Sequence, residues 1–175
     1  LQCNPNNLSQ EYPYLESKNT KVQNVEKDRL NIGVVFETSR ESNAHDDESI
    51  DAEIITNVFN DTHNVICLDE KIIKENLPRL YSEHFNYTDL DELSRFISSL
   101  DLVITVDHLV AHLAGALNIK TILMLPCVPN WRWEITHRNT TPWYKSVTIF
   151  RQDTPGDWKS VIKKVKAKLE ENKHV

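Results

Sequence analysis

The stretch Asp101–Trp133, DLVITVDHLVAHLAGALNIKTILMLPCVPNWRW, decides the fold of this chain. Residues 101–106 are typical of a buried strand, and Asp107 follows at its carboxyl end. The pattern then predicts a buried, alanine-rich helix over 108–117 and a second apolar strand over 121–125. In open α/β sheets, ligands bind outside the carboxyl ends of the strands, where helix N-termini present N–H groups to anions. We therefore expect a ligand site beside Asp107.

Strand and helix patterns alternate along the rest of the chain. Apolar runs predict strands over residues 30–36, 64–68 and 147–150, with a less clear edge strand over 84–87. Amphipathic spacing predicts helices over 50–59, over 88–100 with Thr88 as N-cap and Leu90 facing inward, and from Asp157 to the end. Such alternation implies βαβ units, so the expected fold class is α/β, a Rossmann-like parallel sheet with helices on both faces.

The length of 175 residues fits one domain with a substantial core. We assign residues 1–30 to a polar leader or linker, with a short helix near 21–27, and residues 31–175 to the domain. The net charge of −6 argues against nucleic acid as a partner, which requires a basic footprint. The lysines of residues 159–173 are interpreted as the solvent-exposed face of the last helix.

The cysteines and the absence of long apolar runs indicate the compartment. Three cysteines, an odd number without metal-type spacing, favour a reduced, cytoplasmic protein. No apolar run approaches the roughly 18 residues that cross a bilayer, and no secretory signal pattern is present, so we expect no membrane span. The polar start without Met favours a piece of a longer parent chain.

An ordered set of motifs carries a family resemblance: AHLAGAL at 111–117, LP at 125–126, PNWRW at 129–133, PWY at 142–144, FRQ at 150–152 and PGDW at 155–158. From about residue 13 to residue 169, the chain resembles the C-terminal, donor-binding half of a GT-B glycosyltransferase. It is similar in particular to heptosyltransferase-like (family 9) domains of the kind attached to tetratricopeptide repeats. The resemblance implies one half of a GT-B fold.

The resemblance also implies a function. The domain would bind a nucleotide-sugar donor as substrate, with no metal and no cofactor. A tetratricopeptide or acceptor domain of a longer parent chain would supply the catalytic base and bind a protein or carbohydrate acceptor. The catalytic residues are therefore unknown in this chain.

The turn after the strand 101–106 aligns with the family's usual Asp-Thr-Ser-Val-Ala-His-Leu-Ala-Gly-Ala-Leu, and Asp107, His112 and Gly115 match. The resemblance implies that backbone N–H groups bind the donor diphosphate, namely those of His108, Leu109 and Val110. A helix N-terminus favours this role because it carries about half a positive charge. Asp107 would orient a sugar or ribose hydroxyl or hold the turn.

Two histidines in this turn leave alternatives open. His108 and Leu109 replace the family's Thr-Ser pair, so two side-chain donors are lost. His108 is either a cationic phosphate contact or a partly exposed helix-start residue. His112 lies one helical turn after His108, so the pair with Asp107 could ligate a metal; the alternative is that His112 packs beneath the donor loop. Gly115 is expected to allow close packing of helix on sheet.

Two further segments provide candidate contacts. The loop 37–48 is acid-rich and lacks the glycine that relatives have, and only Arg40 and His45 could contact phosphate there; the alternative is a solvated loop. In the loop after residue 126, Trp131 and Arg132 form either a platform for a base or sugar ring or a surface anchor. By topology, residues 67–69 would lie near the nucleotide base.

Three functions follow from these patterns. The preferred one is the donor-binding domain of a glycosyltransferase. The alternative is a degenerate domain that keeps the fold as a non-catalytic interaction or structural module, which the changes at His108 and Leu109 and the acidic loop favour. The third is another α/β nucleotide or phosphosugar enzyme, such as an epimerase; the absence of a Gly-rich fingerprint argues against a dinucleotide-binding version.

Overall fold

The computed structural model describes residues 13–17, 24–37, 49–69, 81–82, 89–133 and 138–171. The strands of the described residues are β1 (Leu30–Val35), β2 (His63–Cys67), β3 (Tyr81–Ser82), β4 (Leu102–Thr105), β5 (Thr121–Leu125) and β6 (Val147–Arg151). The helices are α1 (Ala52–Thr56), α2 (Leu90–Ile97), α3 (Leu109–Ala116) and α4 (Trp158–Glu171), with a 3₁₀ turn, η3, at Trp131–Trp133.

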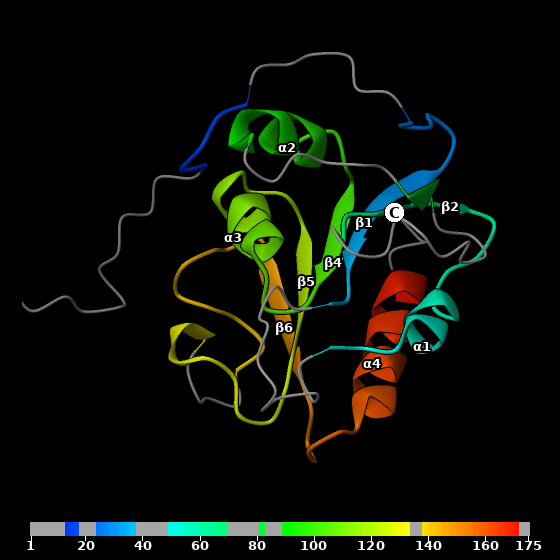
Figure 1. Ribbon diagram of the computed structural model, residues 1–175, viewed down its shortest axis with the longest axis vertical. Helices are drawn as coiled ribbons and strands as arrows, with labels where there is room; N and C mark the ends of the chain where they lie inside the picture. Colours follow the sequence, from blue (N-terminus) through cyan, green and yellow to red (C-terminus); the bar gives the residue numbers. More distant parts are fainter. Residues whose placement is uncertain are drawn as a thin grey trace, which may run out of the picture.

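In the described part of the chain, the strands form one sheet with the order β3-β2-β1-β4-β5-β6 (Figure 1). Every neighbouring pair is parallel. This is the strand order of a Rossmann sheet, in which the chain moves outward from β1 to one side and then returns to build the other side from β4. The predicted Rossmann-like parallel sheet is confirmed.

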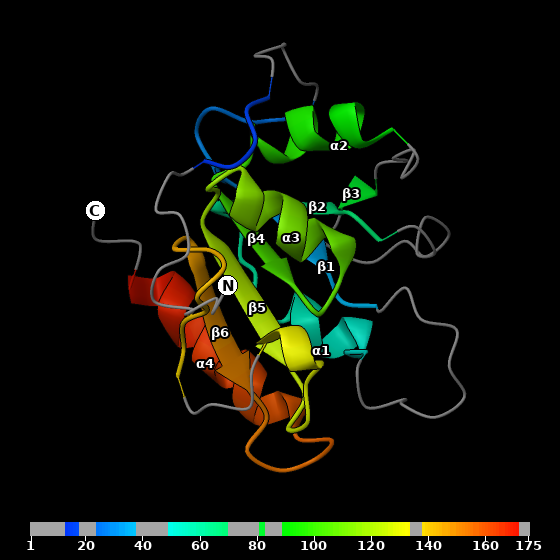
Figure 2. The same ribbon diagram turned by 90° about the vertical axis from the view of Figure 1, so that its left-hand side faces the viewer.

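Helices cover both faces of this sheet, as the sequence predicts. Helices α2 and α3 pack together on one face, and α1 and α4 pack together on the other (Figures 1 and 2). Right-handed crossovers explain the division, because connections that move in opposite directions along a parallel sheet lie on opposite faces. Helices therefore shield both faces of the sheet from solvent, and the strands β1, β2, β4 and β5 are almost fully buried.

The elements with the clearest pattern lie where the sequence predicts them. β5 has the predicted bounds, and α4 begins one residue after Asp157. The inward positions of α4 are all buried: Trp158, Val161, Ile162, Val165 and Leu169. The lysines between them are mostly exposed, which confirms the interpretation of this segment as one amphipathic helix. No helix in the described residues combines the length and the apolar character needed to cross a bilayer.

Short elements differ from the predictions. The edge strand β3 lies at Tyr81–Ser82 instead of residues 84–87, and the helix expected over 50–59 is limited to Ala52–Thr56. The N-cap of α2 is Asp89, whose Oδ1 accepts the N–H of Glu92 at 2.9 Å, instead of Thr88. Leu90, which was expected to face inward, is 46% exposed.

The described segments before β1 differ from the prediction at one end and contact α3 at the other. Of the helix expected near residues 21–27, the described part, 24–27, is not helical. Residues 13–17 cross α3, where the N–H groups of Tyr14 and Leu15 both donate to the carbonyl oxygen of Ala116, at 2.8 and 3.1 Å. These bonds satisfy a carbonyl at the C-terminal end of α3, which has no partner within the helix.

Candidate ligand site at the carboxyl edge of the sheet

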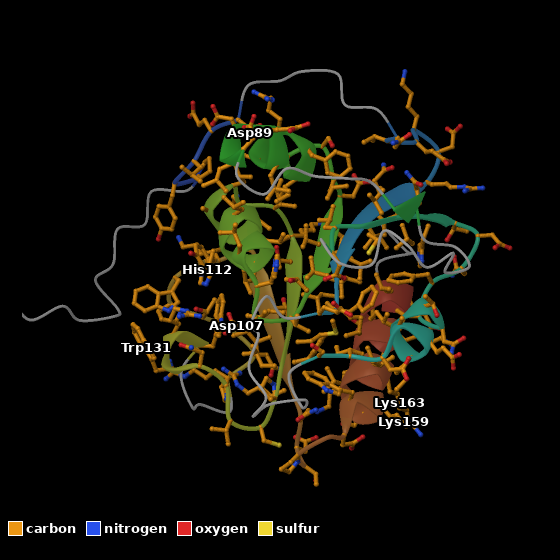
Figure 3. The ribbon with its side chains drawn as sticks, viewed as in Figure 1. Asp89, Asp107, His112, Trp131, Lys159 and Lys163 are labelled. Atoms are coloured by element: carbon orange, nitrogen blue, oxygen red, sulfur yellow. The ribbon has the colours of Figure 1, made fainter. Side chains whose placement is uncertain are left out.

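The candidate site lies between the carboxyl ends of β1 and β4, where the order in which the chain adds strands to the sheet reverses. These two strands are neighbours, although their crossovers leave toward opposite sides of the sheet. Ligands of open α/β sheets bind at this switch point. Helix α3 begins here, four residues after β4 ends. Figure 3 shows Asp107, His112 and Trp131 on this side of the molecule, away from Lys159 and Lys163 of α4.

The carboxylate of Asp107 is held by the loop that follows β5. Its Oδ1 accepts the indole N–H of Trp133 at 2.7 Å, and its Oδ2 lies 3.4 Å from Nη2 of Arg132. The side chain of Asp107 is only 13% exposed. Of the two roles expected for Asp107, holding the turn is the one seen in these contacts; a hydroxyl ligand would have to share the remaining lone pairs of the carboxylate.

An aromatic cluster packs around Trp133, the residue that bonds to Asp107. The ring of His112 stacks on Trp133, with centroids 4.8 Å apart and planes at 17°. Its Nδ1 lies 3.1 Å from the hydroxyl of Tyr144, and burial lowers the pKa of His112. His112 therefore packs beneath the loop, as one of the two alternatives predicts. No group of three or more His, Cys, Asp or Glu side chains that could hold a metal ion is found among the described residues.

Gly115 makes room for a loop residue, not for the sheet. A Cβ atom at this position would lie 2.4 Å from Cγ of Tyr144 and 2.8 Å from two further ring atoms. Real Cβ atoms do not approach other atoms so closely, so the tyrosine ring packs where only glycine leaves space. The predicted close packing of helix on sheet at Gly115 is therefore wrong in its partner, which is Tyr144, 29 residues further along the sequence.

His108 is the N-cap of α3. Its backbone is extended, and its Nδ1 accepts the N–H of Val110 at 3.3 Å. The helix-start position is as predicted, but the expected partial exposure is wrong, since the residue is 9% exposed. Burial lowers the pKa of His108 to about 4, and a proton on Nδ1 would break the cap. The ring is thus neutral near pH 7, which does not favour the cationic alternative.

The three residues of η3 separate the two roles that the sequence left open for this loop. Trp133 is 1% exposed and serves as the anchor, whereas Trp131 is 77% exposed. The side chain of Arg132 is 37% exposed and reaches toward Asp107. Trp143 donates its indole N–H to the carbonyl oxygen of Arg132 at 2.7 Å. The anchor is therefore Trp133, and the exposed tryptophan of the same turn is Trp131.

Asp69, at the end of β2, connects the ends of two strands. Its carboxylate accepts the N–H groups of Phe36 and Glu37, just after β1, at 3.0 and 3.2 Å. Asp69 is 4% exposed, and burial raises its pKa to about 7. Burial and the neighbouring Asp69 also raise the pKa of the Cys67 thiol to about 12, so this cysteine is not a nucleophile. The parallel register of β1 and β2 explains why Asp69 meets these amides.

The other residues predicted to contact a ligand differ in how accessible they are. Leu109, the first residue of α3, is 39% exposed, whereas Val110 is buried and its N–H is bonded to His108. Arg40 and His45 lie outside the described residues. The structure thus brings together Asp107, His108, His112 and the turn 131–133 around the start of α3.

The fold defines the class: this is an α/β domain with the fold of one half of a GT-B glycosyltransferase. Similar solved structures are heptosyltransferases of E. coli. WaaC with ADP has a TM-score of 0.56 and 18% sequence identity over 85% of this chain. WaaC with ADP-2-deoxy-2-fluoro heptose has a TM-score of 0.56 and 20% identity over 85% of this chain.

A third similar structure is that of E. coli ADP-heptose lps heptosyltransferase II, with a TM-score of 0.57 and 15% identity over 83% of this chain. The alignments cover 46%, 45% and 47% of the three enzymes, so this chain spans less than half of their length. No family model and no curated protein matches the sequence. The fold is therefore that of a heptosyltransferase-like half, and the expected tetratricopeptide association stays a prediction.

Proposed function

We propose that this chain binds the diphosphate of a nucleotide-sugar at the carboxyl edge of its sheet, as the donor-binding half of a glycosyltransferase. The observation that carries the proposal is the position of α3, whose N-terminus lies at the switch point between β1 and β4. Such a helix start offers N–H donors and a partial positive charge to an anion. The solved neighbours, which have the same fold, bind ADP and an ADP-sugar analogue.

Arg132 would be the cationic contact of this site. Its guanidinium is partly exposed and bonded to Asp107 only through a long contact of 3.4 Å. A planar guanidinium binds phosphate oxygens in pairs, and it would compensate for the neutral His108. The electrostatic part of the chemistry, stabilising a leaving diphosphate, would then need neither a metal nor a cofactor. In the proposed parent protein, another domain would bind the acceptor and supply the base.

A second candidate function has its own support. Polar groups at this edge are satisfied by the chain itself: Asp107 by Trp133, the Val110 amide by His108, and the amides after β1 by Asp69. A nucleotide-sugar would gain less binding free energy from polar groups that already have hydrogen-bond partners. This favours a domain that keeps the fold as a non-catalytic interaction module.

Calorimetric titration with UDP, GDP, ADP, CMP and their sugar conjugates separates the two functions. We expect micromolar binding of at least one ligand. Arg132→Ala should weaken it at least tenfold. Leu109→Asp should do the same, because it places a negative charge in the phosphate path. An acid in the first turn also stabilises a helix, so this variant should fold.

The matched control is Lys163→Ala on the exposed side of α4, far from the site (Figure 3). Its affinity should equal that of the wild type. If no ligand in the panel binds, or if Leu109→Asp binds as tightly as the wild type, the donor site is refuted and the interaction module becomes the better assignment.

A further inference from the structure

The turn 131–133 presents an exposed aromatic surface beside polar side chains. Trp131 is 77% exposed, and the neighbouring Val128 is 76% exposed. Trp143, 36% exposed, belongs to the same surface because its indole N–H is bonded to the backbone of Arg132. Single exposed apolar residues are ordinary, but several on one surface mark an interaction site.

This surface is held in place from behind. Trp133 is buried and bonded to Asp107, and its backbone N–H donates to Asn130 at 3.0 Å. On the other side, Arg151 donates to the carbonyl oxygen of Trp133 at 2.6 Å. The backbone on both sides of the exposed ring of Trp131 is therefore fixed before any ligand arrives. A preorganised surface loses little entropy on binding.

Hydrogen-bonding capacity remains beside the exposed rings. Nε of Arg132 is buried and has no hydrogen-bond partner among the described residues. Its Nη2 makes only the 3.4 Å contact with Asp107, whose carboxylate can accept further bonds. Because Nε itself is buried, a ligand would bond to the exposed part of the Arg132 side chain, which is 37% exposed as a whole.

The charge of the protein favours a neutral ligand for this surface. The chain has a net charge of −6, which has no effect on the binding of an uncharged polyol. Sugar rings have an apolar C–H face, which fits an indole, and hydroxyl groups that both donate and accept. An aromatic platform next to a paired guanidinium and carboxylate matches both properties.

We propose that Trp131, Trp143 and the Arg132–Asp107 pair form a binding surface for a neutral oligosaccharide. A pyranose ring stacks on the indole of Trp131, and its hydroxyls bond to Arg132 and Asp107. The surface works without a nucleotide, so the inference goes beyond the proposed function and does not depend on it.

Calorimetric titration of the 175-residue chain with cellotetraose, maltotetraose, chitotetraose and mannotetraose tests this surface. We expect at least one to bind in the absence of nucleotide. Trp131→Ala should weaken that binding at least tenfold, as loss of a stacking platform does for other ring ligands. Trp131→Phe, which keeps a ring, should recover most of the affinity, and Lys163→Ala should leave it unchanged.

Three outcomes would overturn the proposal. One is the absence of binding tighter than about 10 mM, near the lower limit of specific affinity, for all four sugars. Another is equal affinity in Trp131→Ala. The third is a concentration-dependent dimer of the wild type that Trp131→Ala abolishes, which would assign the surface to a second copy of this chain.

The nucleotide-sugar site and the oligosaccharide surface are tested by separate experiments, so one proposal can fail while the other stands. Nucleotides tested alone report on the start of α3, through Leu109→Asp, whereas oligosaccharides tested alone report on Trp131. A chain that binds oligosaccharides but no nucleotide would be a carbohydrate-binding module built on a glycosyltransferase fold. A chain that binds nucleotides but none of the four sugars would retain the donor site and lose the inference drawn here.

Discussion

The indole N–H of Trp133 lies 2.7 Å from Oδ1 of Asp107, so the acid after β4 is held by the loop after β5. Two connections on neighbouring strands are thereby joined at the carboxyl edge of the sheet. His112 stacks on the same indole from the side of α3. The start of α3 and the exposed turn 131–133 consequently keep a fixed relation to each other.

Trp133→Phe should show how much this bond stabilises the domain. The variant keeps a buried ring but loses a hydrogen bond to an ionised acceptor, which typically costs about 1.5–3 kcal/mol. Urea unfolding should give a decrease of this size in the free energy of unfolding. Trp131→Phe, at an exposed position of the same turn, should change it by less than about 0.5 kcal/mol. Equal effects of the two substitutions would contradict the anchoring role of Trp133.

Gly115→Ala should destabilise the protein although alanine is the better helix former by about 1 kcal/mol. The new Cβ would meet the ring of Tyr144 at 2.4 Å, and overpacking of this kind costs about 1–3 kcal/mol. A double-mutant cycle with Tyr144→Ala checks the cause. In the Tyr144→Ala background, Gly115→Ala should be neutral or stabilising; an unchanged cost in that background would show that the helix backbone, not the ring, demands glycine.

Asp69 should make the protein less stable as pH rises. Its pKa is about 7 in the folded state, above the ordinary value of 3.8, so the folded state binds the proton more tightly. The stabilisation is complete below about pH 4 and is lost as pH rises through about 7. Urea unfolding of the wild type and Asp69→Asn at several pH values should show this as a difference of about one proton. Parallel stability curves would mean that Asp69 does not titrate in this range.

His108 should make the protein more stable as pH rises, which is opposite to the effect of Asp69. Its pKa falls from 6.5 to about 4 on folding, so its stabilisation is complete above about pH 6.5 and is lost as pH falls toward 4. His108→Asn keeps an N-cap acceptor but removes the titrating ring. This variant should therefore lose less stability than the wild type when the pH is lowered from about 6.5 to 4. Proton NMR of the His108 ring should show the midpoint directly.

Taken by themselves, Asp69 and His108 nearly offset each other in the pH dependence of stability. Between about pH 4 and 6.5, the rise in stability due to His108 and the fall due to Asp69 nearly cancel. Each single substitution should reveal the slope of the group that remains. The wild-type curve alone cannot test either assignment.

Elements with a long, regular apolar pattern could be predicted from the sequence. β5 and α4 are examples: β5 is a continuous apolar run that is buried on both faces, and α4 buries one face whose period of 3.6 residues is visible in the chain. Short elements such as β3 and α1 could not be placed well, since two strand residues carry no pattern and five helical residues make little more than one turn. The cap at Asp89 shows the same limit, because Thr88 and Asp89 are both good capping residues.

The site could be located from the sequence but not assembled. The parallel sheet follows from the alternation of strands and helices, and this alone predicts that Asp107 lies at the carboxyl edge. The bonds from Trp133 to Asp107 and from Phe36 to Asp69 join residues that are 26 and 33 positions apart, and no spacing rule connects such pairs. The burial of His108 depends on how the neighbouring elements pack over the start of α3.

The two bonds from Tyr14 and Leu15 to Ala116 bear on how the protein can be shortened. A fragment that begins at β1 retains every strand of the described residues but leaves the end of α3 without these donors and the ring of Tyr144 without its neighbour Tyr14. A series of N-terminal deletions should therefore lose thermal stability once Tyr14 is removed, well before any strand is reached. The smallest piece that keeps the full stability of this domain extends further toward the N-terminus than its sheet does.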